Sequence, residues 1–398
     1  MSWELAHRAL ARPRLEVRFS AVGTLQAEAQ AAVHLAQAGL YGLSASPRTS
    51  SVARALLGWA RRPGVSGRMA HNALRVASRL RAPLDPAELA QMDVFFSFYA
   101  GIPAQARRAR SLHCGIFVHD LTPILLPQHS SPQQVRGLRR ILSTIRPEDL
   151  VVVNSECTRR DLCAHLGRDP ATVAVVPLAA DTAMFRPVTD PATLVAMRAR
   201  YGLGDGPYLL SLHSAAPHKN MDMLIRAHAS YRSVAGQDAL PLVIAGGKGD
   251  PRAELVTAGL EPSALSGVTF AGFVDDADLA PLYSGAKAFF FPSLYEGFGL
   301  PVLEALLCGV PVFSSRAASL PEVMAPLPLA HRGPDRLLNP TDEGAWAEAF
   351  HAAKHATRLD AAALARLSEA FCWDRSVDLL AKTLGAPGRA SVQKWAEP

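Results

Sequence analysis

Two glutamates stand on either side of a glycine-containing loop in the stretch FPSLYEGFGLPVLEALLCG, residues 291–309. Glu296 precedes Gly297 and Gly299, and Glu304 follows them inside an apolar segment. An ionised carboxylate only accepts hydrogen bonds, so two of them could hold the hydroxyl groups of a polyhydroxylated ligand. The alternative is structural: Glu304 favours the dipole of a helix in its first turn, and Glu296 is solvated. The spacing alone leaves both interpretations open.

The residues around these glutamates predict a strand, a loop and a helix. The apolar run AKAFFFPS (286–293) ends a buried strand, and Pro301 suits the first turn of a helix, where its missing N–H would have no intrahelical partner. Gly309 is typical of a helix end, and VPVFSS (310–315) resumes as a strand. The glycines therefore precede a helix N-terminus, whose free N–H groups and positive dipole end bind phosphate. This position suits a phosphorylated, polyhydroxylated ligand.

The whole chain alternates between apolar runs and helical patterns, in two halves. Continuous apolar runs are typical of strands in parallel sheets covered on both faces. The alternation predicts an α/β fold of doubly wound, mostly parallel sheets, in which ligands bind beyond the carboxyl ends of the strands. The predicted strands are 92–101, 113–120, 149–156, 207–214, 241–247, 267–273, 286–293 and 310–315, and the predicted helices are 131–145, 158–167, 220–234, 276–286 and 301–309.

Length and charge limit the class of protein. The chain has 398 residues, a net charge of +6 and 49% hydrophobic residues, as expected of a globular protein with two or more domains. Residues 1–190 contain 23 arginines, no lysine and 14 acidic residues, a net charge of +9. A basic first half suits an anionic partner such as a phospholipid surface, although the arginine usage could instead reflect a GC-rich genome. No nucleic-acid-binding module is recognisable, so nucleic acid is not expected as a partner.

The cysteines and the apolar runs indicate a compartment. Five cysteines without a CxxC pair argue against a disulfide framework or a zinc site, and are expected to be buried, reduced thiols. No run reaches the roughly 18 apolar residues of a spanning helix. The first residues carry scattered charges and lack the apolar core of a secretory signal. These features predict a cytoplasmic protein.

EGFGLPVLE resembles the signature of the retaining glycosyltransferases of family 4, in which seven residues separate two glutamates. The resemblance extends in order through HDLTPILLP, VVVNSECTRRDL, VVPLAADTAMFRP, YLLSLHSAAPHKNMDMLIRAH, VTFAGFVDDADLAPLYSGAKAFFFPS and FCWDRSVDLL. It implies the GT-B architecture, two Rossmann-like doubly wound domains facing each other across a cleft. The implied parts are an acceptor-binding domain (1–187), a nucleotide-sugar-binding domain (188–370) and a C-terminal helix (371–398) that crosses back to the first domain.

The resemblance also implies roles for individual residues. Glu296 matches the glutamate that contacts the donor sugar, and Glu304 matches the one that holds the nucleotide ribose. Lys219 matches the basic residue that neutralises the donor pyrophosphate, and His119 matches an acceptor-domain histidine near the reacting sugar. His119, Lys219 and Glu296 are thus the expected catalytic residues. The further expected donor-binding residues are Ser214, His218, Gly272, Phe273, Gly297, Phe298, Gly299 and Leu300.

Some of these residues have structural alternatives. Lys219 with Asn220 could begin a surface helix, and His119 beside Asp120 could be a capped loop residue. The triplet Asp276–Ala277–Asp278 has the form of a metal–nucleotide signature from a different glycosyltransferase fold. It precedes an apolar helical pattern, so it is expected to cap that helix instead. We therefore expect an enzyme that needs no metal and no cofactor.

The chain also departs from the family pattern. Ser214 stands where many members have arginine, which weakens the expected pyrophosphate clamp. The N-terminal stretch LEVRFSAVGTLQ offers one glycine, Gly23, in place of a glycine-rich loop that reaches the donor phosphate. That loop is therefore reduced, or the first strand lies elsewhere.

The sequence thus predicts a retaining hexosyltransferase. Its donor would be a nucleotide diphosphate sugar, with GDP-mannose favoured by HDLTPILLP, and its acceptor a glycan or lipid-linked hydroxyl. The basic first half suggests peripheral contact with the inner face of an anionic membrane. Two other classes stay open: a related GT-B enzyme such as a nucleotide-sugar epimerase or hydrolase, and a non-catalytic nucleotide-sugar-binding subunit.

Overall fold

The computed structural model of the chain describes residues 89–98, 100–109, 111–212, 216–247 and 250–385. The N-terminal stretch with Gly23, the expected donor residue Ser214 and the C-terminal tail lie outside these residues. By compactness the described residues form two units. One contains 89–118, 139–152 and 381–385, and the other contains 119–138 and 153–380. The domain boundaries at 187 and 370 remain a prediction.

Among the described residues, the first sheet has four strands, in the order β1-β2-β3-β4. They are β1 (Val94–Ser97), β2 (His113–Val118), β3 (Leu150–Val153) and β4 (Val173–Val175). β1 and β2 pair in parallel, with Val94 opposite His113. The helices in this part of the chain are α6 (Ala104–Arg108), α7 (Thr122–Leu125), α8 (Pro132–Leu142) and α9 (Glu156–Leu166). The first three strands confirm the prediction, whereas β4, only three residues long, was not predicted.

A buried ion pair joins two elements of the first unit. The guanidinium of Arg107, at the end of α6, binds the Asp149 carboxylate, and the aspartate side chain is only 1% exposed. Arg107 also donates to the carbonyl of Thr144 over 2.6 Å, and the Arg146 N–H donates to Asp149 over 2.7 Å. The buried charges are thus paired and further hydrogen-bonded, as burial of charge requires.

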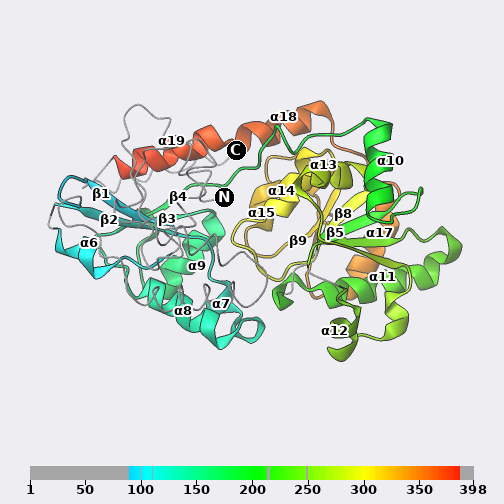
Figure 1. Ribbon diagram of the computed structural model, residues 1–398, viewed down its shortest axis with the longest axis horizontal. Helices are drawn as coiled ribbons and strands as arrows, with labels where there is room; N and C mark the ends of the chain where they lie inside the picture. The colour runs from blue at the N-terminus through cyan, green and yellow to red at the C-terminus, as the bar shows by residue number, and fades with distance from the viewer. Residues whose placement is uncertain (1–88, 99, 110, 213–215, 248–249, 386–398) are drawn as a thin grey trace, which may run out of the picture. The chain divides into compact units, whose positions relative to one another are not determined.

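The second sheet has six strands, in the order β10-β9-β8-β5-β6-β7, and every pairing is parallel. The strands are β5 (Leu209–Leu212), β6 (Leu242–Ala245), β7 (Val268–Gly272), β8 (Ala288–Phe291), β9 (Val312–Ser315) and β10 (Leu337–Leu338). The five predicted strands are confirmed, and the two-residue β10 was not predicted. The strand order places β5 and β8 side by side at the centre of the sheet (Figure 1).

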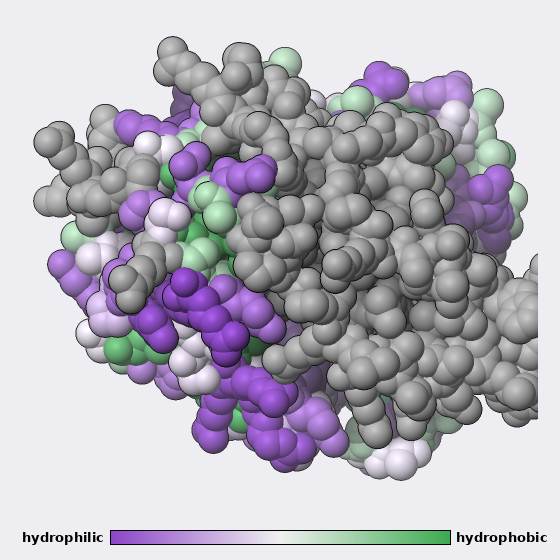
Figure 2. Space-filling model, turned by 60° about the vertical axis from the view of Figure 1, so that its left-hand side comes forward, coloured by the Kyte–Doolittle hydropathy of each residue, from purple (hydrophilic) through white to green (hydrophobic). Residues whose placement is uncertain are grey.

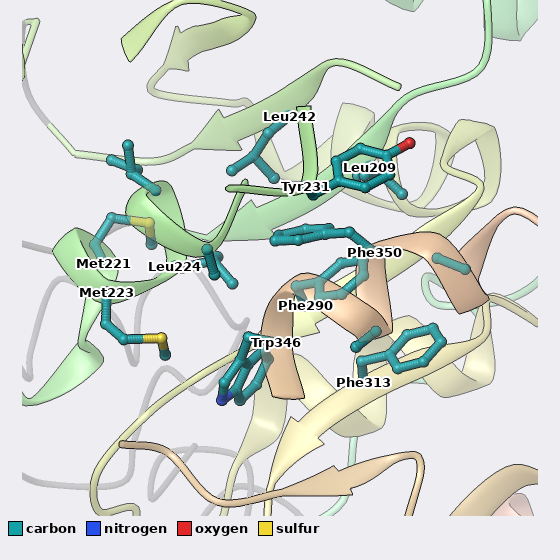
Figure 3. Close-up of a cluster of buried hydrophobic side chains, with 14 of the residues drawn as sticks. Leu209, Met221, Met223, Leu224, Tyr231, Leu242, Phe290, Phe313, Trp346 and Phe350 are labelled. Atoms are coloured by element: carbon teal, nitrogen blue, oxygen red, sulfur yellow. The ribbon is translucent and has the colours of Figure 1, made fainter. Parts of the chain in front are cut away.

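Helices pack on both faces of this sheet, so the strands β6 and β8 are apolar and buried along their whole length. On one face, α11 and α17 enclose a cluster in which Phe290 stacks on Phe313 and Phe350, at ring-centroid distances of 5.0 and 4.2 Å (Figure 3). On the other face, Tyr283 packs edge-on against Phe289 at 5.3 Å. The helices are α10 (Pro191–Arg200), α11 (Met221–Ala235), α12 (Arg252–Thr257), α13 (Asp276–Gly285), α14 (Leu300–Leu307), α15 (Leu320–Met324), α16 (Leu329–Arg332), α17 (Glu343–Ala353), α18 (Ala361–Ala370) and α19 (Trp373–Leu384).

The expected helix cap at the acidic triplet is wrong. Asp275 is the N-cap of α13 and its side chain makes no capping hydrogen bond. Asp278 lies inside the first turn, where its carboxylate accepts hydrogen bonds from Arg200 (2.6 Å) and Tyr201 (2.8 Å). The triplet therefore ties α13 to the end of α10.

Burial of the thiols is confirmed for four of the five cysteines. All five cysteines are free, and all are buried except Cys372, which is half-buried. In the part of the chain that the structure describes, no helix is both long enough and apolar enough to cross a membrane.

Candidate active site

The loop between β8 and α14, residues 292–299, is the centre of the candidate donor site and is called the donor loop below. α14 begins at Leu300, with Pro301 in its first turn and Gly299 as N-cap in the left-handed region, at φ 103°. A side chain on Gly299 would also meet Leu320, because its Cβ would lie 2.5 Å from the leucine Cδ2. Only glycine fits both the dihedral angle and the space. The predicted loop leading into a helix N-terminus is confirmed.

Three consecutive backbone donors at the end of this loop have no acceptor in the part of the chain that the structure describes. They are the N–H groups of Phe298, Gly299 and Leu300. Phe298 and Gly299 are buried, and buried N–H groups are nearly always paired in native proteins. Since these donors also lie at the positive end of α14, the loop is suited to an anion.

Lys219 and Glu296 are in direct contact. The lysine Nζ lies 2.5 Å from a carboxylate oxygen of the glutamate, and the two side chains are 20% and 13% exposed. The ammonium also lies 5.2 Å from the centre of the Phe291 ring. The structure thus brings together the residue expected at the donor pyrophosphate and the residue expected at the donor sugar.

Backbone contacts fix this pair. Lys219 ends a short 3-10 turn (Pro217–Lys219), and Asn220 follows in the left-handed region. The Asn220 side chain donates to the carbonyls of Pro292 (3.2 Å) and Pro340 (2.6 Å). The Leu294 N–H donates to the carbonyl of His218 over 2.8 Å. The turn that carries Lys219 is therefore held against the loop that carries Glu296, and Asn220 is more than a residue that begins a surface helix.

His218 lies in the same electrostatic environment. Burial lowers the pKa of His218 below its usual value, and the neighbouring Lys219 acts in the same direction. Glu296 and Asp120 oppose this shift. A neutral imidazole next to the lysine can donate one N–H to a phosphate oxygen without adding charge.

Glu304 lies about one turn inside α14 and contacts Tyr283 of α13. It accepts a hydrogen bond from the hydroxyl of the buried Tyr283 over 3.1 Å. Burial raises the pKa of Glu304 to about 7, while the hydrogen bond from Tyr283 opposes the shift. Glu304 is therefore not a solvated surface charge. Burying a carboxylate costs free energy unless a hydrogen-bond partner compensates for the lost water.

His119, the third expected catalytic residue, lies next to the loop of Glu296. A Cβ on Gly297 would lie 2.1 Å from the carbonyl oxygen of His119 and 2.8 Å from Cβ of Asp120. The Asp120 carboxylate accepts from the N–H of Thr122 over 2.8 Å, which fixes the turn after β2. The backbone of His119 therefore lies against the loop of Glu296. A role of His119 near the reacting sugar stays a prediction.

The remaining expected donor residues lie at the end of β7. Gly272 ends that strand in the left-handed region, at φ 66°, and its carbonyl accepts from the N–H of Gly246. The ring of Phe273 is 70% exposed, which is high for a large apolar side chain. β5, β7 and β8 are parallel, so Phe273 lies at the same sheet edge as Lys219 and Glu296. An exposed aromatic ring at this edge is suited to stack on a nucleotide base.

Several residues that contact the site were not predicted. The Ser319 hydroxyl lies 2.9 Å from the carbonyl of Glu296 and 2.8 Å from that of Phe298, so it can donate to either. Ser155 donates to the carbonyl of Gly297, and Tyr283 to Glu304. Ser155 lies in a segment that resembles the family, and its type is typical of a helix N-cap. Tyr283 also lies in a segment that resembles the family, but nothing in the sequence signals its contact with Glu304 or the contacts of Ser319.

In the ranges that the structure describes, no group of three or more histidine, cysteine, aspartate or glutamate side chains could hold a metal ion. The lysine, the histidine and the N–H groups of the loop fit the charge of a diphosphate. That the reaction needs no metal stays a prediction.

Residues 196–357 match the family model described as glycosyl transferases group 1. This segment contains Lys219, Glu296 and Glu304, and it includes the whole six-stranded sheet. The match supports the resemblance to glycosyltransferases, while membership of family 4 and retention of configuration stay predictions.

Curated relatives include several mannosyltransferases. The chain is 31% identical over 210 residues to the O-antigen chain mannosyltransferase B of Escherichia coli, covering 52% of this chain and 54% of that protein. It is 33% identical over 183 residues to a GDP-mannose-dependent alpha-(1-6)-phosphatidylinositol monomannoside mannosyltransferase of Mycolicibacterium smegmatis, covering 44% of this chain and 46% of that one. The chain spans about half the length of these relatives.

Solved structures share the fold. Anabaena HepE in complex with UDP has a TM-score of 0.59 and 19% identity, over 75% of this chain and 80% of that one. Sucrose-phosphate synthase from Thermosynechococcus elongatus has a TM-score of 0.56 and 22% identity, over 73% of each chain. These likenesses, with the two parallel sheets, confirm the predicted α/β fold class and its GT-B architecture.

Proposed function

We propose that the protein is a retaining glycosyltransferase that moves a hexose from a nucleotide diphosphate sugar to a hydroxyl of a glycan or lipid-linked acceptor. The observation that carries the proposal is the contact between Lys219 and Glu296, beside three N–H groups of the loop that have no acceptor among the described residues. The Lys219 ammonium can neutralise the charge of a diphosphate, and the Glu296 carboxylate can accept hydrogen bonds from the hydroxyls of a sugar. The matched family model and the mannosyltransferase relatives support the same class.

The site would act chiefly on the leaving group. When the bond between the sugar C1 and the diphosphate oxygen breaks, negative charge grows on the diphosphate. Lys219 and the N–H groups at the start of α14 would stabilise this charge, since prearranged donors favour charge that develops in the transition state. Without such stabilisation the diphosphate would be a poor leaving group.

The acceptor would attack from the face that the diphosphate leaves, so that configuration is retained. The acceptor oxygen forms a bond to C1 as the old bond breaks, and its proton passes to the departing diphosphate oxygen. Glu296 would orient the sugar and stabilise positive charge on it, rather than form a covalent intermediate as in many retaining glycosidases. Glu304 would hold the ribose hydroxyls and Phe273 the base.

A GDP-sugar is the donor that the comparisons favour. The M. smegmatis relative is named for its dependence on GDP-mannose, and the E. coli relative is named a mannosyltransferase. The HDLTPILLP stretch after β2 points in the same direction. We therefore propose GDP-mannose as the first donor to test.

We also propose contact with an anionic membrane surface. Arg136, Arg139 and Arg140 of α8 are all exposed. Figure 2 shows hydrophilic side chains, in purple, gathered on the lower left of the coloured surface. Exposed arginines attract anionic lipid headgroups, and such contact would bring the enzyme to a lipid-linked acceptor in the cytoplasm.

A panel of nucleotide sugars tests the function. GDP-mannose should raise the melting temperature more than UDP- or dTDP-sugars, because a ligand of the native state stabilises it. With an acceptor glycan the wild type should release GDP and form a glycoside, and Lys219→Ala should lower kcat/KM by about 10²–10³. Lys287→Ala is the matched control, since Lys287 precedes β8 at the opposite edge of the sheet.

The same panel separates the other classes. Donor consumption without an acceptor would instead indicate an epimerase or hydrolase. Tight binding without turnover on any acceptor would indicate a binding subunit. If no nucleotide sugar shifts the melting temperature and none is consumed, the proposed function is wrong.

A further inference from the structure

The first turn of α9 contacts the donor loop through two hydroxyls. The Ser155 Oγ donates to the carbonyl of Gly297 over 2.7 Å, and the Thr158 Oγ1 lies 3.3 Å from the same oxygen. Ser155 is 2% exposed and Thr158 is fully buried. The Gly297 carbonyl is therefore held inside the protein, away from solvent.

This contact fixes the direction of the next N–H group. In a planar trans peptide, the C=O of Gly297 and the N–H of Phe298 point to opposite sides. Because the carbonyl faces α9, the Phe298 N–H faces away from α9. That N–H is one of the three donors without an acceptor among the described residues. Rotation of this single peptide would remove a donor from the proposed diphosphate site.

Glu322 holds α9 in place for this contact. Its two carboxylate oxygens accept from the N–H of Glu156 (2.8 Å) and of Cys157 (2.7 Å), which are the first two residues of α9. α15, which contains Glu322, also contains Leu320, and Leu320 would meet any side chain on Gly299. The start of α15 and the start of α9 thus enclose the donor loop together.

A second contact joins α9 to the residue before Glu296. The hydroxyl of Tyr295 donates to the Asp161 carboxylate over 2.7 Å. Tyr295 is only 8% exposed. The loop is therefore attached to α9 at Tyr295 and at Gly297, on both sides of Glu296.

We infer that Ser155 is a positioning residue for the diphosphate site, which holds the Gly297–Phe298 peptide so that its N–H faces the donor. The inference rests on the proposed function, since it assumes a nucleotide diphosphate at the loop. Thr158, Asp161 and Glu322 support the same arrangement. Ser155 does not itself touch the donor and acts through the Gly297 carbonyl.

The test compares a nucleoside diphosphate with its nucleoside. By isothermal titration, Ser155→Ala should weaken binding of GDP about tenfold, the effect of losing one hydrogen bond. Binding of guanosine, which has no phosphate, should stay unchanged. Ser155→Thr keeps the hydroxyl and should restore GDP affinity. A purely structural role would instead change both affinities together.

Two further variants keep the test sharp. Ser155 also accepts from the Thr158 N–H as helix N-cap, so Ser155→Ala loses the cap as well. Ser155→Gly keeps most of the capping free energy and still removes the hydroxyl, so it should show the same selective loss. Ser376→Ala is the matched control, because Ser376 is equally buried and donates to the distant carbonyl of Pro177.

The outcomes distinguish the inference from the proposed function. If the wild type binds GDP and both Ser155→Ala and Ser155→Gly bind it as tightly, the positioning role is wrong while the proposed function stands. An equal loss for GDP and guanosine also overturns the positioning role. If the wild type binds none of GDP, UDP, ADP and dTDP, the proposed function fails and the inference fails with it.

Discussion

At the residue scale, Glu304 is an acid whose charge changes near neutral pH. Burial raises its pKa to about 7 from the ordinary 4.5. Between these two values the folded protein binds a proton that the unfolded chain has lost, so stability falls as the pH rises from 4.5 to 7. At about 1.4 kcal/mol per pKa unit, the loss is about 3 kcal/mol.

This shift predicts the pH dependence of stability. In the variant Glu304→Gln, which cannot ionise, the fall of about 3 kcal/mol between pH 4.5 and 7 should be absent. Denaturant unfolding at pH 5 and pH 8 measures it. Glu254→Gln, on the exposed surface, serves as the control. Parallel pH profiles for wild type and Glu304→Gln would contradict the assignment.

The same residue predicts the pH dependence of donor binding. The carboxylate offers both oxygens as acceptors for two ribose hydroxyls, whereas its protonated form turns one of them into a donor. GDP should therefore bind about tenfold more tightly at pH 8 than at pH 6. Glu304→Gln should bind GDP weakly at both values. Titration of GDP across this range measures the effect, and a flat profile in the wild type would rule out a ribose role for an ionising Glu304.

Lys219 and Glu296 are also best tested as a pair. Because they are in contact at 2.5 Å, the effects of changing each should not add. We expect Lys219→Ala and Glu296→Gln each to lower kcat/KM by about 10²–10³, and the double variant to lose less than the product of the two losses. A double-mutant cycle on hexose transfer measures the coupling. Strict multiplication of the two losses would show that the two residues act independently.

At the element scale, the donor loop is a short segment with neighbours on every side. Gly297 faces the His119 carbonyl, Gly299 faces Leu320, and Ser319 can bond the carbonyls on both sides of Gly297. A displacement of the loop would therefore change contacts with three separate segments. Such a loop is rigid in the way that a prearranged binding site requires.

The loop predicts a sharp difference between two glycines. Gly297→Ala would place Cβ 2.1 Å from a backbone oxygen, so it should abolish transfer and lower the melting temperature. Gly137→Ala should do neither, because a Cβ there meets nothing within 4 Å. In the interior of α8 the alanine should even stabilise, by about 0.5–1 kcal/mol. Activity assays and thermal melts decide, and an active Gly297→Ala would show that the loop can move.

The sequence contains the local part of this loop and none of its distant contacts. Pro301 and Gly309 mark the ends of α14 by their own chemistry, so the strand, loop and helix could be predicted. The hydrogen bond from Ser155 to Gly297 joins residues 142 positions apart, and no spacing rule connects them. The strand β10 was not predicted for a different reason, since two residues are too few to show a strand pattern.

At the scale of the whole molecule, each of the two compact units is stabilised by different interactions within itself. The six-stranded sheet has an aromatic core around Phe290 and Phe350, whereas the first unit contains the buried pair of Arg107 and Asp149. Apolar runs that alternate with helical patterns predicted the α/β fold of both. They could not predict the ion pair, because each partner looks like a surface charge in the sequence.

The ion pair predicts a large effect on stability. Arg107→Met would leave the buried Asp149 carboxylate without its partner, so it should destabilise the protein by about 3–5 kcal/mol. Arg108→Met, in the same helix but exposed, should have little effect. Denaturant melts measure both. Equal stabilities would mean that Asp149 is satisfied by other groups.

The basic surface of α8 predicts salt-dependent membrane binding. The wild type should sediment with phosphatidylserine vesicles at low salt and be released at high salt, because exposed charges are screened there. Replacing Arg136, Arg139 and Arg140 with glutamine should weaken binding, and Arg366→Gln, on α18, should not. Absence of wild-type binding at low salt would refute the proposed contact.

The buried thiols have a practical consequence for observing the site at work. Cys157 is 2% exposed in the first turn of α9, and burial raises its pKa to about 12. The thiolate is the nucleophile that attacks an alkylating reagent, so Cys157 should react only when the start of α9 moves and exposes it. The half-buried Cys372 needs no such opening. The rate at which a maleimide labels Cys157, read by mass spectrometry, therefore measures how often the start of α9 opens. The measurement needs no engineered probe.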